Sequence, residues 1–454
     1  MGRPFSAIEL EEPEEVERAV RRRLVEQLRY VRSASPFYRR KLGEGPEVAP
    51  QDLPHLPFTT KEELRKAQAS DPPFGESRAA DPAEIVRLHL TSGTTGRPIA
   101  IGFTASDHAL SCEIGARAYF ASGIREDDTV LHCLNYALYV GGLADHLSIE
   151  RIGATMVPVG IGQTERMLDL WGDLRPSAMF STPSYASHLA AAARRRGLSP
   201  AGLGLRLLVV GGEPGGDAPE TRRALEQTWG AAVGDAYGLG EVWPTFAGQC
   251  EARDGLHLTG LDALWWELID PAGGDVLPRE PGAEGEIVYT HLRRQATPLV
   301  RYRSGDVVRV LDGDCPCGRR TPRIRILGRA DEMFMVRGVN VFPQAVEAVL
   351  DEEIPGHGAF ALLVEGPAPS PPVPLVVELA PQGQERPAGL AARVCSAVRT
   401  RLQFSCDVTI VEPGALELAS EHKTRRVFRT DLGQCPPGLT GRGLEGKRRE
   451  EASR

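Results

Sequence analysis

Five consecutive residues in the stretch TSGTTGRP have the types expected of a loop that holds phosphate: Ser92, Gly93, Thr94, Thr95 and Gly96. Glycines let backbone N–H groups approach an anion closely, and hydroxyl groups add hydrogen-bond donors without bulk. The common phosphate loop has a lysine after its last glycine, whereas Arg97 and Pro98 follow here. A plain surface turn after a β-like run is the alternative interpretation. A nucleotide bound here would need its lysine from elsewhere in the chain.

Three further segments carry residues suited to a nucleotide. LVVGGEPGG predicts a strand that runs into glycine-rich backbone, against which a flat ligand can lie. In DAYGLGEVWP, Tyr237 could stack on a base, and the Glu241 carboxylate could hold Mg²⁺. Asp306, in RYRSGDVVRV, is placed to accept hydrogen bonds from ribose hydroxyls. Taken singly, each of these acids is more simply a solvated or turn-forming side chain.

Four metal-ligating residues predict a structural zinc site. Cys315 and Cys317 lie close together in CPCGR, and Cys250 precedes His257 within CEARDGLH. Three thiols and one imidazole form a closed Cys₃His set, which leaves no open position for catalysis. Two unrelated pairs of thiols are the alternative. A zinc ion here would tie the strand region near 250 to the turn near 315.

The elements that must position these residues follow from hydrophobic periodicity and turn signals. Residues 13–42 carry a helical pattern, and Thr60 with Glu63 forms a capping box that opens another helix. Strand-like and helix-like runs alternate from about 85 to 245, which predicts a largely parallel α/β sheet. Shorter strands from 255 to 330 predict an antiparallel or barrel-like region, and a smaller unit of strands and helices follows.

Composition narrows the classes of function. The chain has 454 residues and a net charge of −8, which argues against nucleic-acid and anionic-membrane partners. No run reaches the roughly 18–20 apolar residues of a membrane span, and the N-terminus lacks the apolar core of a signal peptide. We therefore expect a cytoplasmic protein with reduced cysteines. Only five of its 53 basic residues are lysines, so a lysine in an informative position stands out.

The order of these motifs resembles the motif series of the adenylate-forming superfamily of acyl-CoA synthetases and adenylation domains. Within it, the phenylacetate–CoA ligase family is the most similar. The stretches that carry this resemblance are TSGTTGRPIAIGFT, YALYVGGLADH, GGEPG, DAYGLGEV, CEARDGLHL, PLVRYRSGD, CPCGR and GRADEMFMVRGVNVFP. SPFYRRKL and LPFTTKEELR near the N-terminus also fit, so the resemblance runs from about residue 15 to 432.

The resemblance implies a reaction between ATP and a carboxylate that gives an acyl-adenylate and pyrophosphate, after which the thiol of coenzyme A displaces AMP. It implies that residues 92–96 hold the β- and γ-phosphates, that Tyr237 packs on adenine and that Glu241 holds Mg²⁺. The other nucleotide-binding positions it implies are Gly212, Glu213, Pro214, Asp235, Gly238, Asp306 and Arg329.

The same resemblance divides the chain into three parts. Residues 1–330 are expected to form an adenylation domain of mainly parallel α/β sheet with a small barrel-like β region. Residues 331–434 are expected to form a small mobile α+β domain that turns about Asp331, and 435–454 a disordered tail. The loop with Arg337, Gly338 and Asn340 would form part of the coenzyme A tunnel. Lys423 matches the catalytic lysine, although His422 stands where the family commonly has glycine.

The acyl pocket is expected between two glycine-containing segments, with Tyr136, Tyr139, Gly141, Gly142, Gly211 and Gly215 as its lining. Two tyrosines and several glycines favour a flat slot for an aryl or arylacetic acid. Asn135 and His146 could meet a polar ring substituent, or serve the core or the surface instead. Loading of a carrier protein or another acceptor is the alternative to coenzyme A, and a non-catalytic nucleotide-binding paralogue is a third interpretation. Homodimers are expected from the resemblance alone.

Overall fold

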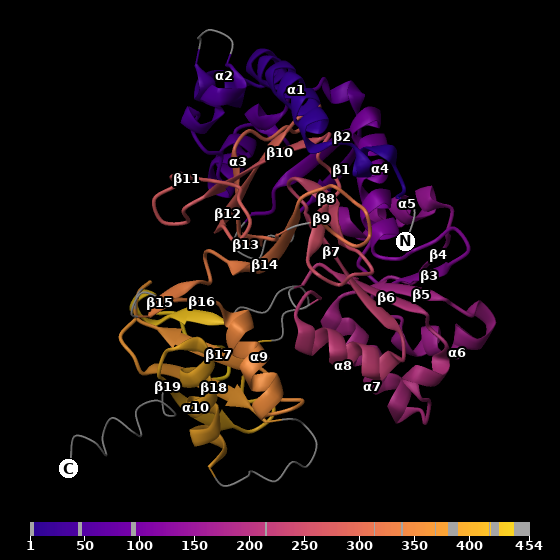
Figure 1. The fold of residues 1–454 in the computed structure, drawn as a ribbon, viewed down its shortest axis with the longest axis vertical. Coiled ribbons are helices and arrows are strands. Elements are labelled where there is room, and N and C mark those ends of the chain that lie inside the picture. The colour runs from indigo at the N-terminus through magenta and orange to yellow at the C-terminus, as the bar shows by residue number, and fades with distance from the viewer. Residues whose placement is uncertain are drawn as a thin grey trace. The chain divides into compact units, whose positions relative to one another are not determined.

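The computed structural model describes residues 4–43, 48–91, 97–213, 216–312, 314–336, 339–367, 369–379, 389–416, 418 and 426–439, with only the backbone of 339 and 340. These residues belong to two compact units, 1–326 and 327–454. The first holds the chain from indigo to orange in Figure 1.

A mixed sheet organises the first unit. Its strand order among the described residues is β11-β10-β12-β13-β14-β9-β8-β7-β6-β5-β3-β4. The parallel strands are β3 (Thr129–His132), β4 (Thr155–Pro158), β5 (Ala178–Ser181), β6 (Leu207–Gly211) and β7 (Ala232–Leu239). The strands that follow are β8 (Trp243–Gln249), β9 (Leu256–Leu258), β10 (Leu264–Ile269), β11 (Val276–Leu277), β12 (Glu284–His291), β13 (Tyr302–Val310) and β14 (Arg323–Arg329). The expected parallel α/β region is confirmed, and the later strands continue the same sheet.

Helices cover both faces of the parallel strands. On one face lie α4 (Ala105–Ala121) and α5 (Val140–Ile152), and on the other α6 (Thr164–Leu174), α7 (Pro183–Arg195) and α8 (Pro219–Trp229), as Figure 1 shows. Alternate strand residues explain the two layers, because Val130 packs toward α4 and Leu131 toward α6. Their buried runs read as continuous apolar stretches, as strands covered on both faces do.

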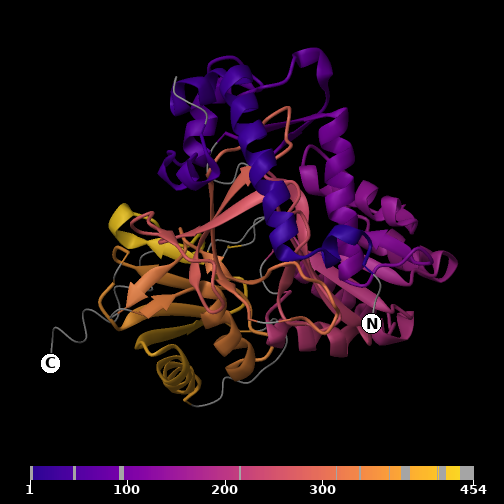
Figure 2. The ribbon, with the colours of Figure 1, turned by 45° about the horizontal axis from the view of Figure 1, so that its top comes forward.

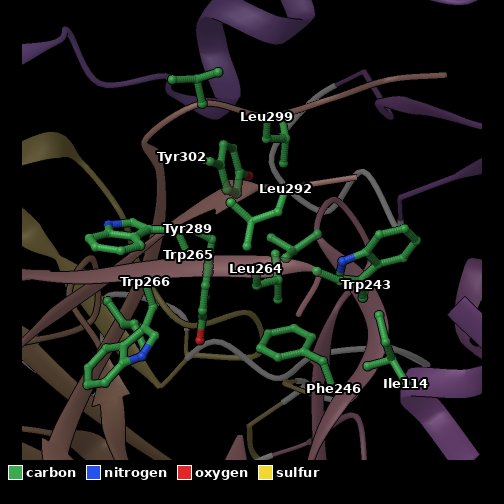
Figure 3. Packing of buried hydrophobic residues seen from close by; sticks show 14 of the residues in the cluster. Ile114, Trp243, Phe246, Leu264, Trp265, Trp266, Tyr289, Leu292, Leu299 and Tyr302 are labelled. Atoms are coloured by element: carbon green, nitrogen blue, oxygen red, sulfur yellow. The ribbon is translucent and has the colours of Figure 1, made fainter. Parts of the chain in front are cut away.

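The N-terminal helices pack on the antiparallel strands. Helix α1 (Pro13–Ala34) lies across them in Figure 2, and α2 (Pro36–Leu42) follows it. The expected helical pattern over 13–42 is therefore broken at Ser35, because a residue before proline avoids helical geometry. Aromatic rings fill the core behind these strands, among them Trp243, Phe246 and Tyr289 (Figure 3).

Short elements complete the first unit. Helix α3 (Lys61–Ala69) begins at the predicted capping box, in which Thr60 accepts a hydrogen bond from the Glu63 N–H. Strands β1 (Ile85–Leu90) and β2 (Ala100–Thr104) pair antiparallel. The 3₁₀ turns are η1 (Ala7–Leu10), η2 (Pro50–His55), η3 (Gly75–Ser77), η4 (Pro82–Glu84) and η5 (Pro200–Leu203).

The second unit is an α+β fold around the sheet order β19-β18-β17-β20. Its elements are β15 (Phe334–Val336), β16 (Val339–Val341), α9 (Pro343–Glu353), β17 (Phe360–Val364), β18 (Val373–Glu378), α10 (Leu390–Leu402), β19 (Cys406–Val411), β20 (Val427–Arg429) and η6 (Thr430–Leu432). Val346, Val394 and Leu375 are buried between the two helices and the sheet, so this unit has its own core. No described helix has the length and apolar character needed to span a bilayer.

Candidate active site

The carboxyl ends of β6 and β7 bring the two predicted adenine-binding segments side by side. The strands pair in parallel, with Gly211 opposite Ala236, and ligands of such sheets bind beyond the carboxyl ends of the strands. Glu213 accepts hydrogen bonds from the backbone N–H and the hydroxyl of Ser184, at 3.2 and 2.9 Å, in the first turn of α7. The Glu213 side chain therefore anchors the loop to α7, so a ligand here would contact the backbone of Glu213 rather than its carboxylate.

Asp235 packs against the same loop at Gly216. An added Cβ on Gly216 would overlap the Asp235 carboxyl group, so only glycine allows this approach. Burial, and next the charge of Asp217, raise the pKa of Asp235 well above its ordinary value. Gly238 is also required for packing, because its Cβ would overlap the Pro244 carbonyl oxygen on the neighbouring strand. Asp235 and Gly238 thus shape the predicted nucleotide-binding segment from within the protein.

Tyr237 and Asp306 form the clearest pair of predicted site residues. The Tyr237 hydroxyl donates to the Asp306 carboxylate at 2.6 Å, which links the end of β7 to β13. Burial, and next the negative charge of Asp306, raise the pKa of Tyr237 well above 10. The Tyr237 ring meets Phe246 edge-on at 5.2 Å between centroids, and Phe246 belongs to the aromatic core in Figure 3. The predicted base-stacking and ribose-binding residues are therefore one rigid group.

Glu241, the predicted Mg²⁺ ligand, pairs with a lysine that the sequence interpretation had not assigned. Lys61 Nζ lies 2.7 Å from Glu241 Oε1, with 39% and 9% of the side chains exposed. The backbone before α3 brings the lysine there, because Thr59 exchanges hydrogen bonds with Arg301 and Arg303 at the start of β13. The scarcity of lysine and its position beside a capping box were signals that could have identified it.

The phosphate loop itself, residues 92–96, lies outside the described residues, as do Pro214 and Gly215. Its flanks are described: Leu90 pairs with Ala100, and the Thr91 N–H donates to the Ile99 carbonyl at 3.0 Å. The predicted turn after a β-like run therefore connects two paired strands.

The predicted acyl segment is a compact loop followed by α5. Asn135 Oδ1 accepts from the Ala137 N–H at 2.9 Å, so Asn135 serves the loop. Gly142 must be glycine, since a Cβ would overlap the Asn135 carbonyl oxygen, whereas a Cβ on Gly141 would meet only Asp145 Oδ2 at 3.2 Å. Tyr139 and Leu90 form a parallel bridge that joins this loop to the strand before the phosphate loop.

Tyr136 and His146 are brought together by this loop and α5. The Tyr136 hydroxyl lies 2.9 Å from His146 Nδ1, and His146 Nε2 lies 2.9 Å from Glu150 Oε1. Tyr136 was predicted to line the acyl pocket, and His146, which was predicted either to meet a ring substituent or to serve the core or surface, holds its hydroxyl.

In the second unit, Arg329 Nε donates to Asp331 Oδ1 at 3.0 Å, so the predicted ribose-assisting and hinge residues form an exposed pair. The backbone of Asn340 pairs with Met335 between β16 and β15. Arg337, Gly338 and the predicted catalytic Lys423 lie outside the described residues.

The four predicted zinc ligands form one cluster. The ligand atoms of Cys250, His257, Cys315 and Cys317 all lie within 4.8 Å of one another. Cys250 follows β8 and His257 lies on β9, and these strands pair antiparallel. The Sγ atoms of Cys250 and Cys315 are 3.4 Å apart, and Cys317 Sγ lies 3.4 Å from His257 Nε2. The alternative of two unrelated thiol pairs does not describe this arrangement.

The donor set suits a tetrahedral zinc ion. Zn–S bonds of about 2.3 Å place ligand atoms about 3.8 Å apart, close to the spacing here. His257 Nδ1 lies 3.0 Å from Thr321 Oγ1, which orients the ring and leaves Nε2 toward the thiols. A hydrogen bond from Cys250 lowers the pKa of Cys317, so the cluster already favours a thiolate.

Comparison with known proteins gives the family. The sequence profile of AMP-binding enzymes matches residues 34–291, and that of the AMP-binding enzyme C-terminal domain matches 338–430. A phenylacetate–coenzyme A ligase of Thermus thermophilus is 36% identical over 89% of this chain and 94% of its own. The corresponding ligase of Escherichia coli is 34% identical over 93% and 96%.

Solved structures agree with the sequence relatives. A 2-hydroxyisobutyryl-CoA ligase in the postadenylation state, in complex with an acyl-AMP, superposes with a TM-score of 0.84 at 30% identity, over 98% of this chain and 94% of the other. A structure of that ligase with the acyl-AMP and CoA in the thioesterification state gives 0.68 at 31% identity, over 97% and 94%. The chain belongs to the phenylacetate–CoA ligase family of AMP-forming, adenylate-forming acid–CoA ligases.

Proposed function

We propose that this enzyme activates an aromatic carboxylic acid with ATP and transfers the acyl group to coenzyme A. In the first half-reaction a carboxylate oxygen bonds to the α-phosphorus and the bond to pyrophosphate breaks. In the second, the coenzyme A sulfur bonds to the acyl carbon, AMP leaves, and the thiol proton passes to solvent. The observation that carries this proposal is the hydrogen bond from Tyr237 to Asp306, which joins the residue predicted to stack on the base to the residue predicted to bind ribose.

Each half of the nucleotide has a proposed partner among the described residues. Asp306 accepts from the ribose hydroxyls while Tyr237 covers the base, and the backbone of Gly212 and Glu213 lies along adenine. The hydrogen bond between Tyr237 and Asp306 holds both groups before ATP arrives, which lowers the entropy lost on binding. Asp235 and Gly238 keep the segment in place from the protein side.

The negative charge of the phosphates would be neutralised by Mg²⁺, by lysines and by the hydrogen-bond donors of the phosphate loop. The Glu241 carboxylate would hold Mg²⁺, which neutralises phosphate oxygens. Lys61 adds an ammonium group beside it, and the donors of residues 92–96 would hold the β- and γ-phosphates. Lys423 is proposed as the cation that bridges the carboxylate and the ribose–phosphate oxygens. Asp331 is proposed as the hinge, and Arg337, Gly338 and Asn340 are proposed to lie beside coenzyme A.

The cysteine–histidine cluster is proposed as a structural zinc site. Four protein ligands complete a tetrahedron, so the ion would have no open position. Its role would be to fix the turn at Cys315 and Cys317 against β8 and β9. The same turn reaches the N-terminal segment, where Arg319 pairs with Glu9.

Carboxylate-dependent exchange of pyrophosphate into ATP, followed by thioester detection, tests this function. We expect exchange with aryl or arylacetic acids and a coenzyme A thioester when the thiol is added. Lys423→Ala should abolish adenylate formation while thiolysis of supplied adenylate continues, and loss of both would contradict its assignment. Exchange without thioester would point to another acceptor, and no exchange with any acid would overturn the proposal.

A further inference from the structure

His132 is a buried histidine at the carboxyl end of β3 that the assigned chemistry does not use. None of its surface is exposed. Its backbone pairs with Phe180 of β5. Its side chain lies on the face covered by α4 and α5, since Val130, two residues earlier, packs there. His132 therefore stands where the sheet meets the proposed acyl pocket.

The ring nitrogens of His132 are buried polar atoms that lack hydrogen bonds in the structure described. Neither Nδ1 nor Nε2 has a hydrogen-bond partner among the described residues. Buried polar groups are nearly always hydrogen-bonded, and each exception needs an explanation. Burial lowers the pKa of His132 to about 3. The ring is therefore neutral at physiological pH, with one nitrogen able to donate and the other to accept.

Aromatic rings lie around the imidazole. The His132 ring centroid is 5.4 Å from that of Phe180 and 5.1 Å from that of Tyr136. A Cβ added to Gly211 would contact the Phe180 ring at 3.3 Å, so Gly211 borders the same ring. Gly211 and Tyr136 are proposed acyl-pocket residues, which places the imidazole at that pocket.

A second polar group faces the same corner. His146 Nε2 lies 2.9 Å from the Glu150 carboxylate, which accepts from an N–H, so the tautomer with its proton on Nε2 satisfies this contact. Nδ1 then accepts the Tyr136 O–H at 2.9 Å. Because the Tyr136 proton then points to His146 Nδ1, the lone pairs of the Tyr136 oxygen can accept a hydrogen bond from another donor. The Tyr136 hydroxyl is thereby set as an acceptor beside the His132 ring.

We propose that His132 and Tyr136 bind a hydroxyl substituent on the ring of the aromatic acid, so that the enzyme selects hydroxylated aryl or arylacetic acids over unsubstituted ones. A hydroxyl both donates and accepts, which matches a neutral imidazole beside a phenolic acceptor. Phe180 and Gly211 would border the ring plane. His146 and Glu150 act through Tyr136 as positioning residues. This inference rests on the proposed function and names the substrate class of its acyl site.

The test compares unsubstituted benzoate and phenylacetate with their hydroxylated isomers in pyrophosphate exchange. For the wild type we expect kcat/KM about 10- to 100-fold higher for one hydroxylated isomer, since an imidazole left unpaired by the unsubstituted acid adds to the lost hydrogen bond. His132→Phe should remove that preference, mainly through KM for the hydroxylated acid. Tyr136→Phe should reduce it by about 3- to 10-fold.

Two further variants make the result specific. Leu131→Ile, on the same strand but facing α6, should change kcat/KM for the hydroxylated and the unsubstituted acid by the same factor. His132→Asn, which keeps polar atoms, should retain part of the preference if His132→Phe folds poorly. Wild-type exchange only with unsubstituted acids, or an unchanged preference in His132→Phe and His132→Asn, would overturn this inference alone. Absence of exchange with every acid would overturn the proposed function and this inference with it.

Discussion

Replacing Lys61 with methionine tests whether its ammonium group acts at the phosphates or only pairs with Glu241. Methionine keeps an unbranched side chain but removes the charge that lies 2.7 Å from Glu241 Oε1. If Lys61 neutralises charge during adenylation, its loss must lower the rate of that step. If it only stabilises the fold, the rate should change little.

The expected size of the effect follows from charge and exposure. A unit charge about 4 Å from another contributes about 4 kcal/mol at an effective dielectric constant of about 20. The Lys61 side chain is 39% exposed, so solvent screening reduces this to about 2 kcal/mol. That corresponds to a rate of adenylation about 30-fold lower. Because the lysine is partly exposed, its ion pair should contribute only about 1 kcal/mol or less to folding.

Pyrophosphate exchange and denaturant unfolding separate the two roles. Lys66→Met is the matched control, because Lys66 lies on the same helix, is 75% exposed and pairs with Glu62. We expect Lys61→Met to lose about 30-fold in exchange, with thiolysis of supplied adenylate and the unfolding midpoint nearly unchanged. Lys66→Met should behave as wild type. Equal exchange rates for both variants would refute the catalytic role of Lys61.

Three further predictions concern the zinc cluster, a buried acid and the nucleotide pair. Protein purified without chelator should contain about one zinc per chain, and Cys317→Ser should lose it and lower Tm by roughly 8–16 °C; zinc-free wild type would contradict the site. Burial raises the pKa of Asp145 from 3.8 to about 7, so the contribution of Asp145 to wild-type stability should fall as pH rises between these values, because the native state holds a proton that the unfolded chain has released. In urea unfolding, the free energy of unfolding of Asp145→Asn minus that of wild type should therefore increase by up to about 4 kcal/mol from pH 4 to pH 8. A difference that does not change with pH would contradict this. Tyr237→Phe removes the 2.6 Å hydrogen bond to Asp306 and should raise KM for ATP about 10- to 100-fold with kcat nearly unchanged; a lower kcat at unchanged KM would argue against a binding role.

The order of motifs was enough to predict the family, the fold class and the type of reaction, and the comparisons confirm all three. Local signals were also reliable. The capping box at Thr60 begins α3 as predicted, because a cap depends on residues only three positions apart. The Cys₃His set was readable because zinc restricts its ligands to a few residue types. Strand–helix alternation predicted the parallel sheet for a similar reason, since periodicity is a property of neighbouring residues.

Contacts between distant segments were decided only by the tertiary structure. Lys61 meets Glu241 because the backbone at Thr59 joins the edge of β13, and no local pattern at either residue encodes that pairing. Glu213 turns to α7 rather than to a ligand. That the His132 imidazole has no hydrogen-bond partner among the described residues likewise depends on the tertiary structure. Burial and hydrogen-bond satisfaction depend on everything that packs around a side chain, and a linear pattern reports only its neighbours along the chain.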